Sequence, residues 1–210
     1  MDNDIKIGKM TIGVCMTNTY FIYRESTKEC VVVDPADKGG LIYDKLTEAG
    51  LKVMGIILTH GHFDHIWGID ELKEKTGVLV YSSEDEAEVL AEPSKNLSSA
   101  YGRNTSIKAD VELKDEEEIT LAGISFKMLK TPGHTPGGCC YYLPEANFLI
   151  SGDTLFCESV GRTDFPGGSM STLVRSIKEK LLVLPENAKV YPGHGGTTTI
   201  GYEKENNPFL

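Results

Sequence analysis

The sequence predicts a single α/β domain, because strand-like and helix-like patterns alternate along its 210 residues. Hydrophobic residues make up 40% of the chain and charged residues 25%, which is typical of a globular protein. A chain of this length buries one sizeable core or, at most, two small ones. We therefore expect one domain over residues 1–210.

A β-hairpin, a helix and a buried strand are expected first. β-branched and aromatic residues crowd residues 18–25 and 30–35, on either side of a polar turn. Apolar residues at helical spacing predict a helix over residues 41–50, and Gly50 stands where a C-terminal cap belongs. The nearly continuous apolar run over residues 53–59 predicts a strand that is buried on both faces.

Two helices flank the next expected strand. The patterns predict a helix over residues 66–77 and a strand over residues 78–81. An acidic helix is expected over residues 83–91, because Ser83 and Glu86 are spaced as an N-terminal capping box.

A long loop separates these elements from a second run of strands. Residues 92–110 show little periodicity, and a loop of this length either covers a substrate or is a plain surface excursion. Three strands, one helix and a last strand are expected after it, before a polar tail. Their ranges are 124–130, 138–143, 148–153, 169–184 and 188–194.

Composition excludes several classes of function. A net charge of −10 without a basic patch argues against nucleic acid as a partner. The chain has no run of 18 apolar residues, so we expect no membrane span, and its polar, acidic start lacks the apolar segment of a secretory signal. Five cysteines without a close-spaced framework suit a reducing compartment. We therefore expect a cytoplasmic protein, with its oligomeric state left open.

Residues 59–65, THGHFDH, hold three of the five histidines and an aspartate. Packed or solvated histidines are the plain alternative to a ligand role. Gly61 disfavours a helix here, and the cluster directly follows a buried strand, where α/β proteins place their sites. Imidazole nitrogens and carboxylate oxygens are donors that zinc, iron and manganese accept. The segment therefore predicts a metal site.

The remaining histidines extend this site. His134 and His194 each follow a Pro-Gly pair at an expected strand end, and Asp153 ends another apolar strand. These seven donors exceed the needs of one tetrahedral ion, so they indicate two ions about 3.5–4 Å apart, bridged by a carboxylate and a hydroxide. The seven predicted ligands are His60, His62, Asp64, His65, His134, Asp153 and His194.

The motifs HGHFDH, TPGHT, SGDT and YPGHG together resemble the metallo-β-lactamase superfamily. Within it the chain is most similar to the glyoxalase II type of hydroxyacyl thioester hydrolase, and LFCESVGRTDFPGG resembles a loop of its short bacterial members. The resemblance implies a four-layer αββα sandwich with the site at its edge. It also implies that His60, His62 and His134 hold the first metal, that Asp64, His65 and His194 hold the second, and that Asp153 bridges them.

The implied activity is hydrolysis of a small-molecule thioester by a dinuclear metalloenzyme. Two divalent ions, zinc in the first place with iron or manganese as alternatives, would share a hydroxide that attacks the thioester carbonyl. Asp64 and Asp153 are the expected catalytic side chains, with Asp64 also orienting the hydroxide. A thiolate leaves with little help from a general acid, because its parent thiol has a pKa of about 8.5.

Two departures from the family pattern reduce the range of substrates that we expect. Metallo-β-lactamases of the commonest type carry a cysteine where Asp153 stands, which argues against a lactam substrate. Longer glyoxalase II enzymes grip glutathione with a C-terminal helical region, whereas this sequence ends 16 residues after His194. We therefore expect loose demands on the thiol half of the substrate.

Other residues have weaker claims to a function. Arg162 in GRTD is the candidate for substrate binding, with a structural pair to Asp164 as the alternative, and Tyr101 and Arg103 on the long loop are weaker candidates. Trp67 is expected in the core. Cys139, Cys140 and Cys157 are expected to be buried free thiols rather than redox residues.

Two rival activities remain open. A persulfide dioxygenase with a mononuclear non-haem iron shares the expected fold and the HxHxDH and GRTD motifs. A metal-bearing scaffold without catalysis is the rival from another class, and a complete ligand set argues against it.

Overall fold

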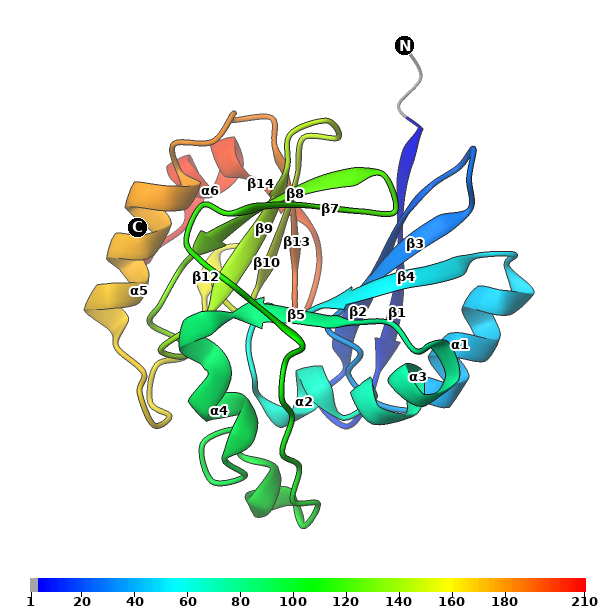
Figure 1. The fold of residues 1–210 in the computed structure, drawn as a ribbon. Coiled ribbons are helices and arrows are strands. Elements are labelled where there is room, and N and C mark those ends of the chain that lie inside the picture. Colours follow the sequence, from blue (N-terminus) through cyan, green and yellow to red (C-terminus); the bar gives the residue numbers. More distant parts are fainter. Residues whose placement is uncertain (1–3) are drawn as a thin grey trace.

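Two six-stranded sheets pack face to face in the computed structural model of the protein, which describes residues 4–210 (Figure 1). Helices α1 (Gly39–Glu48) and α3 (Ile69–Thr76) cover the outer face of the first sheet. Helices α5 (Met170–Ser176) and α6 (Ile200–Asn206) cover the outer face of the second. The expected four-layer αββα sandwich is thus confirmed.

Each sheet is built from one half of the sequence. The first sheet has the order β1 (Ile5–Ile12), β2 (Thr17–Arg24), β3 (Glu29–Val33), β4 (Lys52–Ile57), β5 (Val80–Ser83) and β6 (Val111–Leu113). The second sheet has the order β14 (Thr198–Thr199), β13 (Lys189–Pro192), β10 (Phe148–Gly152), β9 (Cys139–Leu143), β8 (Ile124–Lys130) and β7 (Glu118–Leu121). Smaller elements are α2 (Phe63–Ile66), α4 (Ala87–Ala91), the hairpin strands β11 (Leu155–Phe156) and β12 (Ser159–Val160), the short 3-10 helices η1 (Glu84–Glu86) and η2 (Ser98–Tyr101), and the π-helix η3 (Ile177–Leu181), which continues α5.

Three apolar clusters hold the layers together. The central one lies between the sheets and includes the fully buried Phe126 and Tyr141. The second lies between the first sheet and its helices, where Ile42 and Leu46 of α1 are buried as their helical spacing predicts. The third lies under α5 and η3 and contains the predicted apolar stripe, Leu173, Ile177 and Leu181.

Parallel strand pairs gather the ends of strands at one edge. β3, β4 and β5 run parallel to one another, as do β10 and β13 in the other sheet. Backbone hydrogen bonds join the two sheets there: Cys139 N donates to Thr59 O at 2.8 Å, and Asn18 N donates to Gly193 O at 2.7 Å. The carboxyl ends of both parallel sets therefore face a shared edge, where α/β folds place their sites.

Several elements were not expected from the sequence, among them β1, β6, β7, the hairpin of β11 and β12, β14 and helix α6. Strand β1, which carries several polar residues, pairs antiparallel with β2 along its whole length. The expected polar tail contains helix α6, which Thr199 caps by accepting from Tyr202 N. Glu203 of this helix is buried and accepts hydrogen bonds from Thr198 Oγ1 at 2.5 Å and, from the turn between β11 and β12, from Glu158 N at 2.9 Å, so a tertiary contact helps to form this helix.

Two expected helices take another form. Residues 66–77 are not one helix, because the chain breaks after α2 at Gly68, whose N donates to Pro35 O at 2.8 Å. A Cβ at Gly68 would lie 2.7 Å from that oxygen. The capping box at the start of residues 83–91 is also wrong: Ser83 forms no cap bond, and Glu86 turns inward.

No helix among residues 4–210 is long and apolar enough to cross a membrane.

Candidate metal centre

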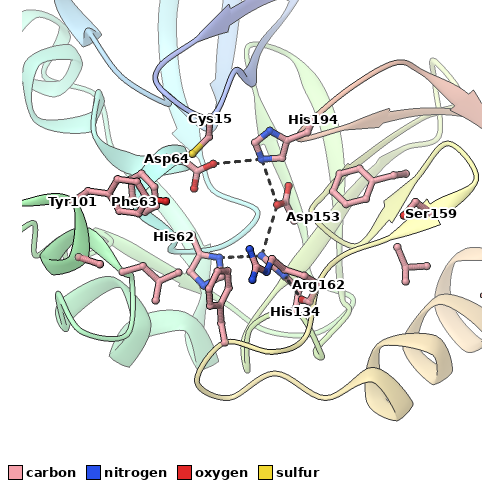
Figure 2. A pocket seen from close by; sticks show the side chains of 15 residues that line it. Cys15, His62, Phe63, Asp64, Tyr101, His134, Asp153, Ser159, Arg162 and His194 are labelled. Carbon is pink, nitrogen blue, oxygen red and sulfur yellow. Dashed lines mark hydrogen bonds and ion pairs between the residues drawn. The ribbon is translucent and has the colours of Figure 1, made fainter.

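The seven predicted ligands meet at the shared strand edge. His60 and His62 lie in the loop after β4, while Asp64 and His65 belong to α2, which directly follows that loop. The other three come from the second sheet: His134 from the loop between β8 and β9, Asp153 after β10, and His194 after β13. Figure 2 shows five of the seven, from both sheets, around one cavity.

Six of the seven predicted ligands form two triads that match the assignment implied by the family resemblance, and Asp34, His60 and His65 form a further group that shares members with both. The donor atoms of His60, His62 and His134 lie within 4.8 Å of one another. Those of Asp64, His65 and His194 do the same. The geometry therefore offers two adjacent three-donor sites, and the identity of these residues as metal ligands stays a prediction.

Asp153 lies between the two triads. One carboxylate oxygen, Oδ1, is 3.4 Å from His65 Nε2. The other, Oδ2, is 3.4 Å from His194 Nε2 and 3.7 Å from His134 Nε2. Asp153 thus reaches a member of each triad, as a bridging carboxylate must (Figure 2).

Close packing around Asp153 explains the second Pro-Gly-His turn. A Cβ on Gly193 would lie 2.3 Å from Asp153 Oδ1 and 2.8 Å from His65 Cε1. A residue with a side chain would therefore displace two predicted ligands at once, so the position before His194 must be glycine.

Unpartnered buried atoms show that these residues fit metal ions. His60 Nε2, His62 Nε2, His65 Nε2 and Asp153 Oδ1 are buried and have no hydrogen-bond partner among residues 4–210. Such atoms are rare in native proteins, because burial without a partner costs free energy. Bound cations would satisfy nitrogen and oxygen donors of this kind.

The electrostatics of the cluster also suit a cation. Burial lowers the pKa of His62 to about 3, so its ring is neutral and keeps a lone pair for a metal. Burial opposes protonation of His65 too, but the carboxylates of Asp64 and Asp153 raise its pKa to about 9. The acidic side of the site therefore attracts positive charge, which a divalent ion supplies.

Asp34 orients one of the ligands from behind. Its Oδ2 lies 2.9 Å from His65 Nδ1, and it also accepts hydrogen bonds from Thr59 N at 2.8 Å and Thr59 Oγ1 at 2.6 Å. Such an outer carboxylate fixes the orientation of a ligating ring. The sequence did not single out Asp34, although its place at the end of a strand parallel to β4 is a signal that would have found it.

Glu86 connects the two loops that carry the first triad. This fully buried carboxylate accepts hydrogen bonds from Gly61 N at 2.8 Å, Gly137 N at 2.8 Å and Thr135 Oγ1 at 3.0 Å. Gly61 lies between His60 and His62, and Thr135 follows His134. Glu86 therefore sets the spacing of these loops, a role opposite to the surface cap expected from the sequence.

Arg162 lies at the rim of the cavity, paired with Asp164. Its Nε and Nη2 donate to the two carboxylate oxygens at 2.7 and 2.6 Å, and its guanidinium lies 3.9 Å from the centre of the Phe165 ring. Its carbonyl oxygen accepts from His134 Nδ1 at 2.7 Å. The alternative of a structural pair is thus present, and the substrate-binding role stays a prediction.

The long loop lies against the ligand segment and lines the cavity. Asn96 O accepts a hydrogen bond from Phe63 N at 2.8 Å, and Tyr101 stacks on the Phe63 ring. Arg103 donates to Trp67 O at 3.0 Å and lies over the buried indole. Residues 92–110 thus form one wall of a cavity of about 580 Å³.

The cysteines are free thiols in different surroundings. Cys139 and Cys140 are buried as expected, whereas Cys157 is exposed at the turn between β11 and β12, contrary to expectation. Cys15, which the sequence did not single out, lines the cavity near Asp64 (Figure 2).

Comparison with curated proteins finds relatives along almost the whole chain. The protein is 40% identical over 208 residues to the probable metallo-hydrolase YqgX of Bacillus subtilis strain 168, covering 98% of each chain. It is 35% identical over 189 residues to the hydroxyacylglutathione hydrolase GloC of Haemophilus influenzae, covering 89% of each. These names and the candidate ligand clusters together support a metalloenzyme.

Solved structures agree with this. BLEG-1, a B3 metallo-beta-lactamase, has a TM-score of 0.93 at 38% identity and covers 98% of this chain and 99% of its own. TTHA1623, solved in a di-iron-bound form, has a TM-score of 0.85 at 34% identity, with 97% and 100% covered. ETHE1 from Myxococcus xanthus has a TM-score of 0.80 at 30% identity, with 97% and 83% covered.

The model of the metallo-beta-lactamase superfamily matches residues 12–194, a range that contains every predicted ligand. This match, the relatives and the four-layer fold point the same way: the chain belongs to the metallo-beta-lactamase superfamily.

Proposed function

We propose that residues 1–210 form one hydrolase domain that cleaves small hydroxyacyl thioesters with two divalent metal ions. The observation that carries this proposal is the pair of three-donor triads with Asp153 between them. Similarity to a protein named hydroxyacylglutathione hydrolase supports the thioester as the bond that is cleaved. Zinc is the proposed metal, with iron and manganese as alternatives, since a similar structure is di-iron-bound.

The side chains of the cavity have distinct roles in this reaction. When bound, the two ions would supply a hydroxide at neutral pH and positive charge for the carbonyl oxygen. Asp64 is held by Thr17, whose Oγ1 donates to its Oδ2 at 2.9 Å, and its carboxylate orients the attacking group by accepting a hydrogen bond. All five histidines stand in the triads, so none is free as a general acid, which suits a thiolate leaving group better than an amine.

Metal content provides the first test. Elemental analysis of metal-replete protein is expected to approach two equivalents of metal per chain, because each triad can hold one ion and Asp153 reaches both. A protein with one of its triads broken, such as His194→Ala, should lose about one equivalent. A stoichiometry that stays at one iron in the unmodified protein would contradict the dinuclear site.

Thioester hydrolysis provides the second test. Metal-replete protein is expected to hydrolyse lactoyl esters of glutathione and of shorter thiols with kcat/KM values within about 100-fold of one another, since the peptide groups of glutathione add little to transition-state binding where no site is dedicated to them. A β-lactam belongs in the same panel because of the similarity to BLEG-1. Absence of any thioester turnover at full metal loading would refute the proposal.

A persulfide dioxygenase is the second candidate, and the observation behind it is the similarity to ETHE1. Oxygen uptake with a persulfide on iron-loaded protein separates the two reactions. Hydrolysis without oxygen uptake supports the thioesterase, and oxygen uptake without hydrolysis supports the dioxygenase.

A further inference from the structure

The cavity above the two triads has apolar walls. Of its lining residues, those outside the predicted ligand set include seven apolar or aromatic side chains. Phe63, Leu97, Ala100 and Tyr101 lie on the side of the long loop, and Phe156, Val160 and Phe165 come from the chain after Asp153. A small hydroxyacyl group at the ligands leaves most of the 580 Å³ free for the other half of a thioester.

Tyr101 is an exposed part of the first wall, with 55% of its surface accessible. Its ring stacks on Phe63 at a centroid distance of 4.1 Å and an angle of 28°. Phe63 lies between the ligands His62 and Asp64, so the Tyr101 ring is fixed relative to the site of reaction. The ring thus packs on Phe63, lines the cavity and still exposes surface that a ligand can cover.

Within residues 4–210, the cavity walls carry one cationic side chain, and that side chain is already paired with a carboxylate. Among the described residues that line the cavity, Arg162 is the one arginine or lysine. Its Nε and Nη2 both donate to the carboxylate of Asp164. This charge is therefore balanced by a carboxylate two residues away. A carboxylate on the thiol half would have to compete with Asp164 for this one guanidinium or lie against aromatic rings, which is unfavourable.

We propose that the thiol half of the substrate is uncharged and apolar, and that it packs against Tyr101 and the facing wall of Phe156, Val160 and Phe165. This inference rests on the proposed thioesterase function and names the class of leaving thiol. Apolar area removed from water and contact between aromatic rings would supply the binding energy.

Two matched lactoyl thioesters test the inference. One carries benzyl mercaptan and the other carries the same thiol with a carboxylate at the para position, so that they differ in charge at similar size. We expect kcat/KM for the neutral ester to exceed that for the carboxylate ester at least about 10-fold, because the one cationic side chain among the described residues of the cavity walls is already paired with Asp164. A third ester, of N-acetylcysteamine, reports on the reaction without an aromatic thiol.

Variants at Tyr101 connect this preference to the residue. Tyr101→Ala is expected to lower kcat/KM for the benzyl ester about 10-fold and to change it less than about 2-fold for the N-acetylcysteamine ester, since only the former covers the ring. Tyr101→Phe should retain the preference. Tyr202→Ala, which removes a similarly exposed tyrosine outside the cavity, should leave both values unchanged.

The outcomes separate the two proposals. Turnover of all three esters with no preference for the neutral one, or an equal loss on every ester in Tyr101→Ala, would overturn the apolar subsite and leave the thioesterase standing. Absence of turnover with every ester would overturn the thioesterase and this inference with it.

Discussion

Asp153→Ala is expected to lower kcat/KM for thioester hydrolysis by more than about 100-fold, since losing even an outer partner of a metal ligand typically costs 10–100-fold. The carboxylate stands within 3.7 Å of donors from both triads, so its removal disturbs both ions together. Arg162→Ala is the comparison at the same cavity. Its side chain is exposed and paired with Asp164, so we expect a loss below about 10-fold, mainly in KM.

Steady-state kinetics and metal analysis on the same preparations check this expectation. Asp153→Ala should bind less metal, a result that does not depend on the substrate, whereas Arg162→Ala should keep the full complement. An arginine variant with the greater loss in kcat would show that the roles assigned to these two residues are wrong.

Glu86→Ala is expected to lower the free energy of unfolding by about 3–5 kcal/mol. The change leaves Gly61 N, Gly137 N and Thr135 Oγ1 without their acceptor, and each unsatisfied buried donor costs about 1–3 kcal/mol. The loops of the first triad also lose their common anchor, so metal binding should weaken. Denaturant unfolding and metal titration measure the two effects separately.

Two further variants keep this prediction falsifiable. Glu86→Gln retains the shape and one acceptor, so we expect it to fold with a smaller loss of stability. Glu88→Ala removes a neighbouring exposed carboxylate that pairs with Lys95, and should change stability by less than about 0.5 kcal/mol. Equal unfolding midpoints for Glu86→Ala and Glu88→Ala would disprove the anchoring role.

The sequence predicted where the candidate ligands lie in the fold because the rule behind the prediction is local. A buried strand followed by a polar cluster ends at the edge of its sheet, and His60, His134, Asp153 and His194 all follow such runs. The grouping into two triads came from the family resemblance, since spacing along a chain does not show which loops face each other.

The sequence did not predict the positioning roles of Glu86 and Asp34, because their hydrogen-bond partners are far away in sequence. Glu86 fits a surface capping box from its neighbours alone, and its real partners lie 25 to 51 positions away. Asp34 reaches His65 across 31 positions. A sequence pattern shows only hydrogen bonds between neighbouring residues. In the fold, the two carboxylate oxygens of Glu86 instead accept from three buried donors on distant loops.

Unexpected elements have the same origin. Strand β1 carries several polar residues and owes its form to pairing with β2 along its whole length. Helix α6 depends on the buried Glu203, which accepts a hydrogen bond from Glu158 N, 45 positions earlier in the sequence. Residues 66–77 keep helical spacing across Gly68, yet close contact with Pro35 interrupts the helix.

Because each half of the chain forms one sheet, the proposed ion binding would report whether the two halves have assembled. Each triad draws two donors from the half that ends with β6 and one from the half that begins with β7. If the chain were divided between these two strands, each fragment would hold only part of each triad. Complete triads would form only when the fragments associate. Thermodynamic linkage makes the effect reciprocal. If association of the fragments raises the affinity for the ion by some factor, the ion raises the affinity of one fragment for the other by the same factor.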